Sequence, residues 1–167
     1  MRFRSVTTSL AAVSVSALAL AGLPLASAQT VSEFTVSNIT DFHGRWEQKL
    51  DAKDPNKSIP GAVALKCAVD EAAAGRAHAF TSSGDLIGAS PFASMILDDQ
   101  PTIDIMNLMG LDVSAVGNHE FDRGADDLTQ RIVPEADWTY LAEGAEGLDR
   151  STGIKGYEIM DLSLIHI

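Results

Sequence analysis

The sequence predicts an α/β layered fold with a largely parallel central sheet. Short runs rich in β-branched and apolar residues alternate along the chain with segments of helical character, the order in which parallel sheets are built. Three of the predicted strands are followed directly by clusters of polar residues. In parallel sheets, ligands bind beyond the carboxyl ends of the strands, so these clusters are expected to share one edge.

The individual elements follow from hydrophobic periodicity and from turn residues. Strands are predicted at 34–39, 77–82, 113–116, 138–141 and 157–162. A helix is expected to begin at Pro60-Gly61 and to end near Gly75, because glycine commonly terminates helices. Shorter helical segments are predicted at 91–97, 102–109 and 126–132, and an exposed loop at 47–60.

Residues 1–28 are predicted to be a secretory signal peptide. Arg2 and Arg4 precede an apolar run over 10–25, which is followed by the small residues of 26–28. A retained transmembrane anchor is the alternative, although the run is short and contains Pro24. Cleavage would leave no membrane-spanning segment, and the protein is then expected to be secreted, periplasmic or attached to the cell wall.

The rest of the chain is predicted to form one domain over 29–161. Residues 162–167 break off abruptly in a strand-like run and resemble a translated sequencing adapter, so they are expected to be a non-native tail. Without Arg2 and Arg4 the chain has 10 basic and 23 acidic residues, a formal charge of −13. Binding of nucleic acid through a basic face is therefore not expected. The single cysteine, Cys67, excludes an intramolecular disulfide and is predicted to be a buried helix residue.

The three polar clusters contain the candidate functional residues. Asp41 and His43 follow the first predicted strand, and Gly84-Asp85 follows the second. Each pair taken singly also fits an ordinary solvated turn. The third cluster, residues 117–122, places an amide, an imidazole and two carboxylates at a strand end, where they can converge on a metal ion or a phosphate. Its simpler interpretation is a turn in which Asp122 caps a following helix.

Taken in order, Asp41-Phe-His-Gly44, Gly84-Asp85 with Ser90-Pro91, and Gly117-Asn-His-Glu-Phe-Asp122 resemble the calcineurin-like metallophosphoesterases, most closely their 5′-nucleotidase family. The similarity extends over about 34–162, the first half of that family's catalytic domain. It implies a fold of central sheets flanked by helices, incomplete in this chain. It also implies two divalent metal ions, for which zinc and manganese both remain open.

The resemblance implies a role for most of the polar residues. Asp41 and His43 match ligands of one metal, Asp85 matches the carboxylate that bridges both metals, and Asn118 matches a ligand of the second. His119 matches the catalytic histidine and Asp122 the acid that orients it. Glu120 has no implied role, and a hydrogen bond within the loop is expected for it.

The chain departs from the family in two respects. The usual Gly-Ser pair after the second motif is Ala89-Ser90 here. The histidine ligands of later blocks and the C-terminal nucleoside-binding domain are absent, so the chain is expected to be an N-terminal part that is inactive by itself. The implied activity is release of phosphate from nucleotides by an exported phosphohydrolase. The substrate remains open among 5′-nucleotides, 2′,3′-cyclic nucleotides and nucleotide sugars. A non-catalytic metal- or nucleotide-binding surface protein and an inactive fragment are the alternatives.

Overall fold

A computed structural model describes residues 33–148 and 150–162. Four parallel strands form one sheet in the order β1-β2-β3-β4: β1 (Phe34–Ile39), β2 (Ala77–Ser82), β3 (Val113–Ala115) and β4 (Thr139–Leu141). The predicted signal peptide lies outside the described residues, as does all of the predicted tail except Leu162. The predicted α/β class with a parallel central sheet is confirmed.

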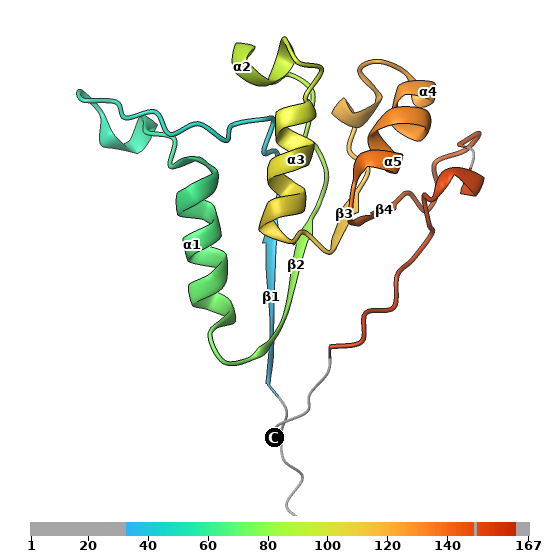
Figure 1. Ribbon diagram of the computed structural model, residues 1–167, viewed down its shortest axis with the longest axis horizontal. Coiled ribbons are helices and arrows are strands. Elements are labelled where there is room, and N and C mark those ends of the chain that lie inside the picture. Colours follow the sequence, from blue (N-terminus) through green and yellow to red (C-terminus); the bar gives the residue numbers. More distant parts are fainter. Residues whose placement is uncertain (1–32, 149, 163–167) are drawn as a thin grey trace, which may run out of the picture. The chain divides into compact units, whose positions relative to one another are not determined.

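Helices make every connection between the strands (Figure 1). They are α1 (Gly61–Ala73), then α2 (Phe92–Met95) with α3 (Gln100–Met109), and finally α4 (Ala125–Asp127) and α5 (Val133–Glu135), joined by a π-helical turn over Leu128–Ile132. Single 3₁₀ turns occur at Pro55–Lys57, His119–Phe121 and Arg150–Thr152. Each strand lies beside its predecessor, so right-handed crossovers place these helices on one face of the sheet.

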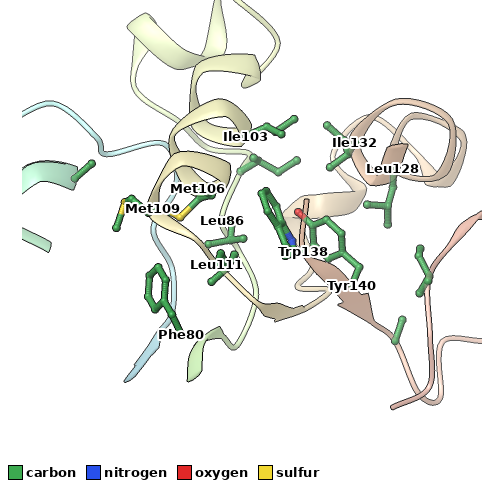
Figure 2. Packing of buried hydrophobic residues seen from close by; sticks show 14 of the residues in the cluster. Phe80, Leu86, Ile103, Met106, Met109, Leu111, Leu128, Ile132, Trp138 and Tyr140 are labelled. Carbon is green, nitrogen blue, oxygen red and sulfur yellow. The ribbon is translucent and has the colours of Figure 1, made fainter. Parts of the chain in front are cut away.

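The hydrophobic core lies between the helices and this face of the sheet. Phe80 on β2 and Tyr140 on β4 are fully buried, together with Ile103 and Met106, which are one helical turn apart on α3 (Figure 2). Complete burial of side chains of this size stabilises a fold by about 1.5–3 kcal/mol each. This packing holds the carboxyl ends of the strands in place. On the other face, by contrast, Phe34 and Val36 of the edge strand β1 are exposed.

Two predictions are wrong. Residues 157–162 form no strand, because only Lys155 bridges to β4 before the chain leaves the sheet edge and lines a cavity with Val113 and Thr139. Cys67 is exposed, since α1 turns Ala62 and Val69 toward the core and leaves Cys67 on its outer side. No helix in the described ranges has the length and apolar character needed to cross a membrane.

Candidate metal centre

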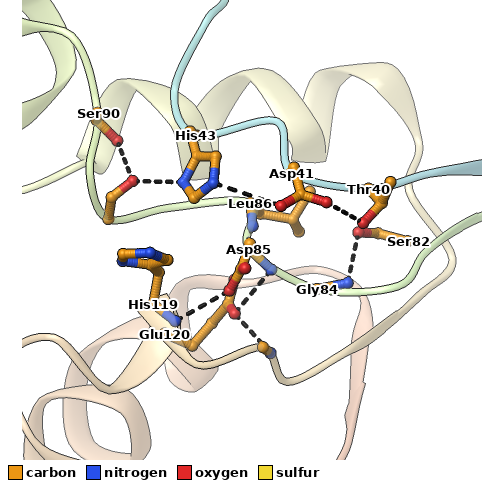
Figure 3. A network of polar contacts seen from close by, with 12 residues as sticks. Thr40, Asp41, His43, Ser82, Gly84, Asp85, Leu86, Ser90, His119 and Glu120 are labelled. Carbon is orange, nitrogen blue, oxygen red and sulfur yellow. Dashed lines mark hydrogen bonds and ion pairs between the residues drawn. The ribbon is translucent and has the colours of Figure 1, made fainter.

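The three polar clusters meet at the carboxyl ends of β1, β2 and β3. The backbone of the first loop is hydrogen-bonded to the second: the N–H groups of Asp41 and His43 donate to the carbonyls of Gly84 and Asp85 at 3.2 and 3.0 Å. The third loop joins through Asp85, whose carboxylate accepts the backbone N–H of His119 at 2.9 Å (Figure 3). Residues far apart in the sequence thus form one site.

Close backbone approach at this site requires glycine. A Cβ atom on Gly117 would lie 2.2 Å from a carboxylate oxygen of Asp85, and one on Gly84 would lie 2.7 Å from the backbone nitrogen of Gly117. Neither contact is sterically allowed, so the second and third loops can touch only with glycine at both positions. The sequence motif therefore has a steric basis as well as a chemical one.

The backbone at the site is strained at three of the candidate metal ligands. Asp41, His43 and Asp85 all adopt positive φ angles, of 52°, 48° and 55°. This left-handed conformation costs an L-residue roughly 1–2 kcal/mol, although aspartate tolerates it better than most. Outliers of this kind concentrate at functional sites, where surrounding contacts hold them in place.

Three side chains converge closely enough to share one cation. Within the described residues, His43, Asp85 and His119 each offer a ligand atom, and these atoms lie within 4.8 Å of one another. The two imidazole rings meet edge to face, with centroids 4.9 Å apart. A carboxylate oxygen of Asp41 lies 3.7 Å from Nε2 of His43, so the first predicted pair borders the same point (Figure 3).

The orientation of the His43 ring is set by a hydrogen bond at Nδ1. Nδ1 lies 2.8 Å from the carbonyl oxygen of Gly88, which can only accept a hydrogen bond. Nδ1 therefore carries the proton, and Nε2 keeps its lone pair on the side of Asp41. Metal-binding histidines are commonly fixed in this way by a backbone carbonyl.

His119 is held by Asp122, as the resemblance implies. Its Nδ1 donates to the Asp122 carboxylate at 2.9 Å. This hydrogen bond is the main reason that the pKa of His119 lies above the ordinary imidazole value, because the carboxylate stabilises the protonated ring. Asp122 does not act as a helix cap: Gly124 precedes α4, so the simpler interpretation of the motif is wrong.

Asn118 lies exposed at the start of the 3₁₀ turn, directly before His119. Its neighbour His119 is one of the three imidazole and carboxylate side chains that converge. The resemblance assigns His119 to catalysis, and its Nε2 is free for either role because Nδ1 is bound to Asp122.

The loop hydrogen bond predicted for Glu120 is confirmed, and the structure shows it to be threefold. Glu120 is 2% exposed, and its carboxylate accepts the backbone N–H groups of Asp85, Leu86 and Gly117 at 3.0, 2.8 and 2.7 Å. Burial raises the pKa of Glu120, and these three hydrogen bonds work against that rise. The side chain thereby ties the second loop to the third (Figure 3).

This donor set suits a divalent cation. Imidazole and carboxylate groups are the usual ligands of zinc and manganese. Gly84 and Gly117 let the backbone approach these groups closely, because no side chain of their own lies in between. A parallel sheet with such a candidate site at its carboxyl edge is the arrangement that the resemblance to the metallophosphoesterases implies.

Solved nucleotidase structures have this fold. An NAD nucleotidase from Haemophilus influenzae matches 75% of the chain with a TM-score of 0.60 and 18% identity, and a 5′-nucleotidase precursor from Thermus thermophilus matches 75% with a TM-score of 0.59 and 19% identity. The chain covers 24% and 25% of these proteins. The resemblance to the 5′-nucleotidase family that the three motifs predict is confirmed at the level of the fold.

The chain is also similar in sequence to proteins from several bacteria. The chain is 40% identical over 101 residues to an uncharacterised protein from the pqq-V 5′ region of Acinetobacter calcoaceticus, over 54% of the chain and 50% of that protein. It is 31% identical to endonuclease YhcR of Bacillus subtilis, over 77% of the chain and 10% of the relative, and 37% identical to cell wall protein Lmo0130 of Listeria monocytogenes, over 52% and 12%. The chain thus spans half or less of these relatives. No family model matches it.

Proposed function

We propose that this chain is the N-terminal part of an exported, divalent-metal-dependent phosphohydrolase that releases phosphate from nucleotides. The observation that carries the proposal is the convergence of His43, Asp85 and His119, with His119 supported by Asp122. The nucleotidases of the same fold support a nucleotide substrate.

The residues divide by chemistry. Asp41 and His43 would hold one cation, Asn118 the second, and Asp85 would contribute to both. Two such cations supply positive charge for the phosphoryl oxygens and an activated water. The chain's own contribution is the preorganised loop framework, in which the backbone N–H of His119 fixes the Asp85 carboxylate. Without cations, the neighbouring carboxylates of Asp41 and Asp85 would repel a phosphate.

His119 would act on the leaving group. Because Asp122 favours its protonated form, the ring offers a positive charge and a proton where negative charge develops on the departing oxygen. Asp122 accepts from Nδ1 and so directs Nε2 outward. This pair has no evident use in a protein that only binds metal or nucleotide, which favours an enzyme over the binding alternative.

Hydrolysis assays test the proposal. The mature chain and the product of the intact gene are incubated with Mn²⁺ and one of three substrates, and the product of each is measured: inorganic phosphate from AMP, a nucleoside monophosphate from 2′,3′-cyclic AMP, and a sugar phosphate from a nucleotide sugar. We expect His119→Ala to lower turnover of the active form by about 100-fold or more, with bound metal largely retained. His78→Ala is the matched control, because His78 lies on β2 and contacts Ser37 outside the site. A metal-loaded intact protein without activity would establish the binding alternative instead.

Export is a separate part of the proposal. It rests on the signal-like composition of 1–28 and on the similarity to a cell wall protein. N-terminal sequencing of the protein from the culture medium, periplasm or cell wall should find a mature chain that begins at Gln29. Accumulation in the cytoplasm with Met1 retained would exclude it.

A further inference from the structure

A buried polar cluster lies behind the candidate metal centre, at the start of α3. Ser94 and Thr102 are completely buried, and Asp99 is 8% exposed. The Ser94 hydroxyl donates to one carboxylate oxygen of Asp99 at 2.7 Å and lies 2.7 Å from the hydroxyl of Thr102. None of these residues belongs to the three sequence motifs.

Asp99 connects this cluster to His43. Its second carboxylate oxygen accepts the backbone N–H of Gly88 at 3.1 Å. The carbonyl of Gly88 in turn accepts from Nδ1 of His43 at 2.8 Å. One glycine residue thus receives a hydrogen bond from the ring on one side and is held by a carboxylate on the other.

Asp99 lowers the stability of the fold in two ways that a purely structural residue at this position would avoid. Burial of a carboxylate costs free energy, and its φ of 64° adds the cost of the left-handed conformation, which glycine would avoid. Asp99 precedes α3, but its side chain makes no hydrogen bond that caps the helix. The carboxylate is instead committed to Ser94 and Gly88.

We propose that Asp99 is a positioning residue for the metal centre. By holding Gly88, it keeps the carbonyl aimed at His43, which fixes the ring with Nδ1 protonated and Nε2 free for a cation. The link to a cation rests on the proposed function, whereas the control of the His43 tautomer does not.

Two neighbouring aspartates allow a matched comparison. Asp98 and Asp99 both have positive φ angles, of 56° and 64°, so glycine relieves the same backbone strain at either position. Asp98 differs in its contact, since its carboxylate pairs with Arg123 on the surface. Asp99→Gly therefore removes the buried contacts with Gly88 and Ser94, whereas Asp98→Gly relieves the backbone strain and removes only the surface ion pair.

The first measurement is the His43 tautomer in metal-free protein, from two-bond ¹H–¹⁵N correlation spectra at a pH where the ring is neutral. Wild type and Asp98→Gly should show the Nδ1–H form, and Asp99→Gly should show a mixture with the Nε2–H form. Asp99→Asn should resemble wild type, because an amide oxygen can still accept from Gly88 while its NH₂ group donates to Ser94.

The second measurement is binding of Mn²⁺ alone by titration calorimetry. Asp99→Gly should weaken binding about 10-fold, and the Asn and Asp98 variants should not. If Asp99→Gly does not fold, Ser94→Ala replaces it and should shift both readouts in the same direction. A His43 that stays in the Nδ1–H form in Asp99→Gly, or an equal loss in Asp98→Gly, would overturn the proposal. If the wild-type product of the intact gene binds no Mn²⁺, the proposed function is overturned, while the tautomer still decides the role of Asp99.

Discussion

Replacement of Glu120 tests whether one buried carboxylate holds the second and third loops together. In Glu120→Gln, one oxygen becomes an NH₂ group that faces a backbone N–H. The loss of stability is smallest if the amide oxygen still accepts the backbone N–H groups of Asp85 and Gly117, and the NH₂ group faces the backbone N–H of Leu86. One orphaned donor costs about 1–3 kcal/mol, and the two remaining bonds lose their ionic character. Relief from burying a charge offsets part of this cost.

We therefore expect Glu120→Gln to lower the free energy of unfolding by about 2 kcal/mol, and Glu120→Ala, which orphans three donors, by about 4 kcal/mol. For a slope near 2 kcal/mol per molar urea, the glutamine variant unfolds at a midpoint about 1 M lower. Circular dichroism of the mature chain in EDTA measures this shift without any metal contribution. Glu71→Gln, on the exposed side of α1, is the control. If Glu120→Gln lies within about 0.5 kcal/mol of wild type, the typical range for a surface substitution, Glu120 does not hold the loops.

Three further predictions concern the same loops. Asp122→Asn should lower the pKa of His119, followed by NMR titration in EDTA. Because the folded pKa is raised, the pair's stabilising contribution is complete below about pH 6.5 and disappears as pH rises through the folded value; a stability deficit that grows with pH would contradict this sign. Gly88→Ala should destabilise the fold by about 2 kcal/mol or more in urea unfolding, since its φ is 73° and a Cβ would lie 2.7 Å from the backbone oxygen of His119; a neutral effect would refute the close packing. Ala89→Gly should raise stability by about 0.5–1 kcal/mol because Ala89 has a φ of 46°, and a lower melting temperature would show that the left-handed strain is not relieved.

The sheet and its order of elements were predictable because local patterns determine them. The alternation and the β-branched residues of 34–39 predicted a strand with the observed bounds, and so did the short run 77–82 that ends before Ser83-Gly84. Residues 157–162 are also rich in apolar residues. A strand also needs a partner, however, and pairing beyond β4 ends at Lys155. Periodicity describes which side chains match a sheet face and not whether a neighbouring strand is available.

The same distinction applies to the candidate site: some of its residues could be predicted from local sequence, and others are recognised only in the tertiary structure. Residues in the three motifs were predictable because glycine, histidine and carboxylate stand together at strand ends. Asp99 was not, since it lies among Asp98 and other helix-start residues, and only the tertiary structure brings it to Gly88. The loop hydrogen bond of Glu120 was predictable from its place in the motif, but its three backbone partners were not, since Asp85 and Leu86 come from another loop.

The left-handed backbone at Asp41, His43 and Asp85 affects how mutagenesis at this site must be interpreted. Alanine at such φ angles is disfavoured, so an alanine variant loses a side chain and gains conformational strain in the same step. A drop in metal affinity then cannot be attributed to the missing ligand. Asparagine tolerates the left-handed region, which makes it the appropriate reference residue at all three positions, and glycine provides the complementary reference that removes the side chain without strain.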